Sequence, residues 1–327
     1  MTKPLIAILI GMLSVSAFAA DQTTSDSQST LKVEDLKDKN KVSGDLDEEI
    51  SNAKLRAESG SKSKWSGSFT AIYQGASLEK PLDKDRPNPT NQPIPDRVKM
   101  FGDIGIRYRM DKNQSLAFGT GYSIQRPLQE AKTGEIDDPY IQYNNTQKVG
   151  TVQSVSSLTA SAATNLDERT AGEVAAGSVM QTFMYDFNGS RASIGLAFEG
   201  DYNYYNVNPD TVVTLKGHSP RPAAAYQTDY ALAAYPMFEY AFSDRFQFRT
   251  VFRPWNYVHT PGDGGWTFAK YPWTQSIGLG IAVTRDVYLY PNFQYAWEDW
   301  RGDDFNWFRK NTRANSTVGL NATINVF

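Results

Sequence analysis

The chain has 327 residues, and its 33 Lys and Arg stand against 36 Asp and Glu, which gives a formal net charge of −3. A balance this close to neutral gives no support to nucleic-acid binding. With no cysteine and only two histidines, the sequence excludes a disulfide framework and a thiolate metal site, and we expect no metal centre or cofactor.

The first 20 residues have the order of a secretory signal peptide. Lys3 supplies a positive charge, the apolar run PLIAILIGMLSVS follows, and Ala17-Phe18-Ala19 forms an A-x-A cleavage site. The run is too short for a transmembrane helix, and no later run approaches 18 apolar residues. We therefore expect residues 1–20 to be removed on export.

Two segments precede the main body of the chain. Residues 21–45 are polar and charged, which predicts a flexible arm. Residues 46–60 predict a short amphipathic helix, with Asp45 as a cap, Gly60 as a stop and one narrow apolar stripe: Leu46, Ile50, Ala53 and Ala57. The favoured interpretation is a surface helix that links the arm to the fold that follows. The alternative is a helix that enters that fold or packs against a partner.

From residue 64 to residue 327 the apolar pattern has a period of two. Aromatic and aliphatic residues alternate with Gly, Ser, Thr, Asn, Gln and charged residues, which is typical of strands with two different surroundings. The pattern leaves the facing of the strands between 139 and 187 open. The predicted strands are 65–74, 103–110, 116–124, 139–147, 150–162, 172–187, 194–204, 232–242, 246–258, 277–283, 287–297 and 317–326.

The connectors between these strands are alternately short and long. Tight turns are predicted at 111–113, 188–190, 243–245 and 284–286, and less clearly at 147–150. The long loops are 76–98, 126–138, 163–171, 208–224, 259–269 and 299–312. This plan predicts an all-β fold, an antiparallel up-and-down barrel of about twelve strands with both ends on the short-turn side.

The composition of the two faces decides between a soluble and a membrane barrel. A soluble β-sandwich or lipocalin-like barrel would bury its large apolar residues inside. Here the second face is small and polar and cannot form a dry core, so we expect water inside the barrel. The aromatic face must then meet lipid, and closure leaves no unpaired strand edge in hydrocarbon. Residues 64–327 are therefore predicted to form a transmembrane β-barrel.

The signal peptide, the alternating strands and the terminal Phe327 together resemble Gram-negative outer-membrane β-barrel proteins of a small, porin-like kind. The resemblance implies a place in the outer membrane, in contact with lipid and lipopolysaccharide, with the arm and the helix in the periplasm. It also implies that the barrel-assembly machinery reads the terminal Phe. One departure is that Asn325, Thr323 and Asn321 occupy the positions two, four and six residues before Phe327, where the family signature is apolar.

Strand parity predicts which charged residues line the pore. A three-residue turn at 243–245 would place Glu239 across from Arg249 and Tyr235 across from Arg253. The charges either form a constriction with basic and acidic walls or fill a narrow lumen as ion pairs without conduction, and their mixed signs argue against a dedicated anion or cation pore. The candidate pore-lining residues are Asp103, Arg107, Arg109, Glu199, Asp201, Glu239, Arg249 and Arg253.

The expected function is therefore an outer-membrane channel for passive diffusion of small hydrophilic solutes and ions, as a monomer or a homo-oligomer. The main alternative is a non-conducting barrel whose long loops serve adhesion, surface interaction or envelope structure. A hydrolase is less favoured, because His218 and His259 lie in or beside loops and no nucleophile–base pairing is evident. We expect the protein not to be an enzyme.

Overall fold

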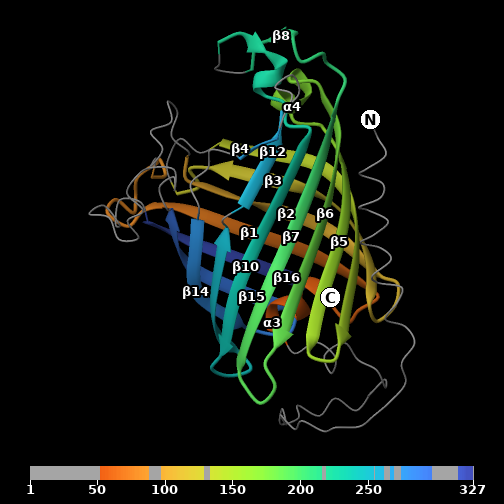
Figure 1. Ribbon diagram of the computed structural model, residues 1–327, viewed down its shortest axis with the longest axis vertical. Coiled ribbons are helices and arrows are strands. Elements are labelled where there is room, and N and C mark those ends of the chain that lie inside the picture. The colour runs from red at the N-terminus through yellow and green to blue at the C-terminus, as the bar shows by residue number, and fades with distance from the viewer. Residues whose placement is uncertain are drawn as a thin grey trace. The chain divides into compact units, whose positions relative to one another are not determined.

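Figure 1 shows a computed structural model of the protein. The structure describes residues 52–87, 97–128, 133–215, 219–253, 255–260, 266–268, 274–296 and 316–326, which all belong to the unit that spans residues 46–327. The predicted signal peptide, the predicted arm and Phe327 lie outside the described residues. None of the helices in the described part is long and apolar enough to cross a membrane.

Within the described residues, twelve antiparallel strands close into a barrel, as predicted. Each strand pairs with its neighbours along the chain, and the last strand pairs with the first, which leaves no open edge. The twelve are β1 (Trp65–Ser77), β2 (Lys99–Arg109), β3 (Gln114–Gln125), β4 (Thr133–Val149), β5 (Val152–Ala162), β6 (Glu173–Asp186), β7 (Ala192–Tyr205), β10 (Tyr230–Ala241), β11 (Phe246–Arg253), β14 (Thr274–Ala282), β15 (Val287–Ala296) and β16 (Ser316–Val326).

The connectors define two different ends of the barrel. At the short-turn end, tight turns join β2 to β3, β4 to β5, β6 to β7, β10 to β11 and β14 to β15. At the long-loop end lie the other connections, together with the small elements α4 (Leu166–Thr170), β8 (Val212–Val213), β9 (Arg221–Pro222) and η1 (Ala223–Ala225), several of which are visible at the top of Figure 1. There β12 (Trp255–His259) also pairs with β10 and with β13 (Trp266–Phe268).

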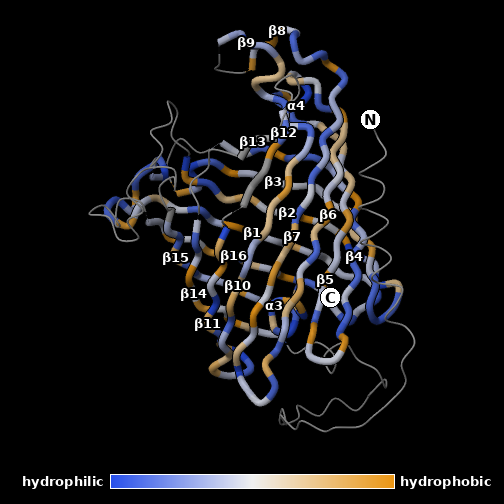
Figure 2. Tube along the Cα trace, viewed as in Figure 1, coloured by the Kyte–Doolittle hydropathy of each residue, from blue (hydrophilic) through white to orange (hydrophobic). Residues whose placement is uncertain are grey.

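The register of neighbouring strands places apolar residues opposite one another on the outer face. Ile106 on β2 pairs with Phe118 on β3, which pairs with Ile141 on β4, and their exposed fractions are 57%, 47% and 43%. Figure 2 shows the resulting alternation of orange with blue or white along the strands. So much exposed apolar surface is unlike a soluble monomer and suits contact with lipid.

The pairing also gives the facing of the strands that the sequence left open. Leu158 pairs with Tyr143 and faces outward, whereas Gln142 on β4 pairs with Thr159 on β5 and faces the lumen. On β6, Phe183 is 37% exposed on the outside, while the next residue, Met184, is 1% exposed inside. Strand β4 begins at Thr133, inside the predicted loop 126–138, so this loop is shorter than expected.

The helix α3 (Ala53–Ser59) lies inside the barrel. It contacts β4 and β5 on one part of the ring and β14, β15 and β16 on another, which only an element within the ring can do. The favoured interpretation of a surface helix is therefore wrong, and the alternative of a helix that enters the fold is confirmed. The N-cap is Asn52, whose side chain accepts a hydrogen bond from the Leu55 N–H, so Asp45 does not cap this helix. Gly60, with a φ of 89°, ends it as predicted.

Candidate functional site

The candidate site is the barrel lumen, and its short-turn half is filled by residues 52–61, here called the lumenal plug. Leu55 is 1% exposed, and it belongs to an apolar cluster of inward-facing residues from the wall: Val155, Met184, Ala197, Met237 and Val251. On the other side of α3, Ala53 and Ala57 pack against Tyr288 and Tyr290 of β15. The expectation that the inner face could not form a dry core is therefore wrong in the short-turn half of the barrel, because these apolar residues of the wall pack against the plug. Burial of Leu55 alone contributes about 2 kcal/mol.

The carboxyl end of the plug is held by hydrogen bonds from the barrel wall. Arg107 Nη1 donates to the Glu58 carbonyl at 2.8 Å, and Asn325 Nδ2 donates to the Ala57 carbonyl at 2.9 Å. The last turn of a helix leaves such carbonyls without helical partners, and cations are favourable near that end. Two further arginines complete the set: Arg285 donates to the Gly60 carbonyl at 3.0 Å and Arg109 to the Ser61 carbonyl at 3.3 Å.

The amino end of the plug reaches the buried ion pair that the sequence predicted. Arg249 on β11 donates to Glu239, its partner residue on β10, and Asn52 Nδ2 donates to the same carboxylate at 2.5 Å. The Asn52 N–H also donates to Gln153 Oε1 at 3.0 Å. Glu239 and Arg249 are 2% and 4% exposed. Both face inward as expected, but the plug covers them. They therefore join β10, β11 and the plug, and they do not line the accessible part of the lumen.

The remaining candidates lie beyond the plug. Asp103 is half-buried and accepts a hydrogen bond from Thr70 Oγ1 at 2.9 Å. Glu199 accepts from the Tyr235 hydroxyl, and Asp201 is half-buried two residues further along β7. Arg253 is exposed in the lumen, and its guanidinium carbon lies 5.5 Å from the centre of the Tyr235 ring, which fits the predicted register. The predicted set therefore divides into residues engaged with the plug and residues open to the lumen.

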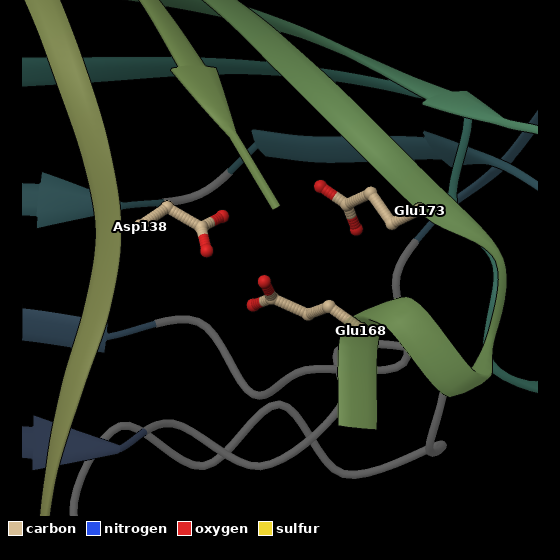
Figure 3. Close-up of side chains that lie close together, drawn as sticks. All are labelled: Asp138, Glu168 and Glu173. Carbon is tan, nitrogen blue, oxygen red and sulfur yellow. The ribbon is translucent and has the colours of Figure 1, made fainter. Parts of the chain in front are cut away.

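A group of three carboxylates at the long-loop end was not predicted from the sequence. Figure 3 shows Asp138, Glu168 and Glu173 pointing toward one another, and their nearest oxygens lie within 4.8 Å of each other. Burial, and then the Asp138 carboxylate, raise the pKa of Glu168 on α4 to about 8. A protonated Glu168 can donate a hydrogen bond to Asp138, so proton sharing accounts for the close approach. The only signal in the sequence was acidic residues on two adjacent loops, which is common.

Of the two histidines, His259 lies in the described part of the chain, where it is paired with a carboxylate. His259 Nδ1 lies 2.6 Å from Asp229 Oδ1, and the ring lies edge-on to Tyr230. This pair joins the end of β12 to the residue before β10. His218 lies outside the described residues.

Comparison with known proteins identifies the fold but not a family. No protein-family model and no curated protein matches the sequence. An outer membrane channel from Pseudomonas putida F1 is similar in structure, with a TM-score of 0.50 and 9% identity over 82% of this chain and 98% of that chain. The NanC porin has a TM-score of 0.40 at 11% identity, covering 80% of this chain and 98% of its own. At such low identity the likeness concerns the fold alone, and it is the fold of an outer-membrane channel.

Proposed function

We propose that this protein is an outer-membrane channel through which small hydrophilic solutes and ions diffuse passively along a charged lumen. The observation that carries the proposal is the contrast between the two faces of the closed barrel. The outer face exposes large apolar side chains, whereas Arg253, Asp201 and Asp103 on the inner face keep partly or fully accessible charges beyond the plug. Accessible charge inside a lipid-facing barrel is expected where water fills the lumen.

The number of strands supports the same function. Barrels of eight strands are filled by their own side chains, and those of sixteen to eighteen leave a wide channel. A twelve-stranded barrel lies between these limits. In this protein the plug takes up part of that width, so we expect a narrow conducting path.

The orientation and partners follow from the same proposal. Short turns face the periplasm in barrels of this type, which would place the plug at the periplasmic end and the α4 loop outside the cell. The outer face would contact lipid and lipopolysaccharide, and the barrel-assembly machinery would insert the chain. The channel is proposed to act without catalysis, as a monomer or a homo-oligomer.

Single-channel recording of the purified protein in a planar lipid bilayer tests the proposal. Stable current steps are the expected result. The chain has no cysteine, so an Arg253→Cys variant carries a single thiol, and a charged thiol reagent should change its current while leaving the unmodified protein unaffected. No current from a barrel shown to be folded by its heat-modifiable gel shift would overturn the proposal and favour a role in adhesion or envelope structure.

A further inference from the structure

The plug changes the balance of charge that faces the lumen. Of the four arginines in the candidate set, Arg107 and Arg109 donate to plug carbonyls, and Arg249 donates to Glu239. Glu239 is the one acidic candidate covered in the same way. Two guanidinium groups are thus bonded to the plug, and a third is bonded to the buried Glu239. Of the four arginines, Arg253 alone is exposed in the lumen.

The acidic candidates beyond the plug have no such partners. Asp103, Glu199 and Asp201 project inward from β2 and β7, and Asp137 on β4 lies on the same side as the inward-facing Gly121. Asp103 is bonded to Thr70 and Glu199 to Tyr235, both of which are neutral donors. Within the described residues, none of these four carboxylates forms an ion pair with Lys or Arg.

Two further basic side chains lie at the long-loop end of the barrel and form no ion pair with these four carboxylates within the described residues. Arg86 donates to Gln74 on β1 and to Gln294 on β15, and Lys99 lies at the start of β2 over the Phe101 ring. Four carboxylates without a cationic partner among the described residues therefore follow the wall from β2 to β7. Lys99 on β2 borders this wall at one edge, and Arg253 on β11, the strand after β10, borders it at the other.

We infer that the lumen is selective for cations, so that small cations and cationic solutes pass along the β2–β7 wall in preference to anions. This inference rests on the proposed function as a channel. Carboxylates that line a pore raise the local concentration of cations and exclude anions, and the effect is strongest where the wall has a low dielectric constant. The plug contributes to this selectivity, because it engages Arg107 and Arg109, whose charges would otherwise face the lumen with these carboxylates.

The reversal potential of the channel in a KCl gradient tests this inference. For the unmodified protein, we expect a reversal potential closer to the equilibrium potential of K⁺ than to that of Cl⁻. The double variant Glu199→Gln, Asp201→Asn should shift the reversal potential toward the equilibrium potential of Cl⁻. Arg253→Gln should shift it further toward the equilibrium potential of K⁺. Asp244→Asn is the matched control, because it removes an exposed carboxylate on the turn between β10 and β11 and should change little.

The outcomes separate this inference from the proposed function. Currents that are non-selective or anion-selective in the unmodified protein would overturn the inference and leave the channel function intact. A cation-selective channel whose reversal potential ignores Glu199, Asp201 and Arg253 would also overturn it, since the selectivity would then arise elsewhere. Absence of current from the folded barrel would overturn the channel function, and the cation selectivity with it.

Discussion

Arg249 on β11 and Glu239 on β10 form an ion pair that is almost completely buried, and Asn52 of the lumenal plug completes the coordination of the carboxylate. Tyr290 adds a hydrogen bond of 3.2 Å to the Arg249 carbonyl. The removal of two charges from water is costly, and the pair persists only because several groups satisfy it together. Asn52 of the plug supplies one of these groups, so the position of the plug in the lumen and the stability of the β10–β11 hairpin are linked.

Truncation of the carboxylate should therefore destabilise the barrel strongly. Glu239→Ala leaves the Arg249 guanidinium buried without its partner, and we expect a loss of about 3–5 kcal/mol in the free energy of unfolding. Urea-induced unfolding in lipid vesicles, followed by tryptophan fluorescence, measures this loss.

The matched control for this substitution replaces both members of the pair. Glu239→Leu combined with Arg249→Met removes both charges and keeps most of the volume, and such replacements are often neutral or stabilising. The double variant should recover most of the lost stability. If Glu239→Ala unfolds at the same urea concentration as the unmodified protein, the pair is not a structural element.

Leu55 should hold the plug in the lumen. A charge at this position would have to enter the apolar cluster of Met184, Met237, Val155 and Val251, where it has no partner. We expect Leu55→Asp to expel the plug and to raise the single-channel conductance, while the barrel remains folded. Leu82→Asp is the control, since Leu82 is 82% exposed. An unchanged conductance in a folded Leu55→Asp barrel would mean that the plug does not limit the current.

Gly278 allows β14 and β15 to approach closely, and its substitution tests this packing. A Cβ atom at Gly278 would lie 2.3 Å from the Pro291 carbonyl oxygen and 2.8 Å from the Asn292 Cα, both of them backbone atoms. Gly278→Ala should cost about 1–3 kcal/mol of the free energy of unfolding, as other overpacked sites do. At Gly177 on β6 the nearest atom is 3.8 Å away, so Gly177→Ala should be nearly neutral in the same urea experiment. Equal effects at the two sites would contradict this explanation.

The strands could be predicted because lipid and lumen impose opposite requirements on alternate residues. A one-residue slip would place Glu239 or Arg249 in lipid, so the alternation predicts that both face the lumen, and the three-residue turn at 243–245 then predicts that they pair. The same argument fails in β5, VQSVSSLTASA, whose Ser, Thr and Ala residues suit either surrounding. There the facing is set by the neighbouring strands, which place Thr159 opposite Gln142.

The plug could be predicted as a helix but not as an element of the lumen. Its apolar stripe includes Ala53 and Ala57, and these do pack against β15. Leu55, the largest fully buried side chain of the plug, lies off that stripe, because a helix inside a barrel is surrounded and buries more than one face. The partners of Arg107 and Arg285 are backbone carbonyls, which leave no mark in the sequence. For this reason the sequence predicted a lumen lined by charges of mixed sign, whereas in the structure the plug engages Arg107 and Arg109.

Glu168 should make the α4 loop sensitive to pH. Its pKa is raised to about 8, above the ordinary value of 4.5, so the folded loop binds a proton that the opened loop releases between these two values. The free energy of opening is therefore greatest at acidic pH and falls as pH rises toward 8. Glu168→Gln, which keeps the hydrogen-bond donor without the charge, should remove this dependence.

Hydrogen exchange of the amides in residues 163–172 measures the opening. A ratio of exchange rates between Glu168→Gln and the unmodified protein, taken at one pH, cancels the intrinsic pH dependence of exchange. The variant should exchange more slowly than the unmodified protein at pH values above about 8 and at the same rate below about pH 4, where Glu168 is protonated in both the folded and the opened loop. Asp167→Asn is the control, because Asp167 is exposed on the same helix and is not one of the three clustered carboxylates. A constant ratio across this range would mean that Glu168 does not carry the proton.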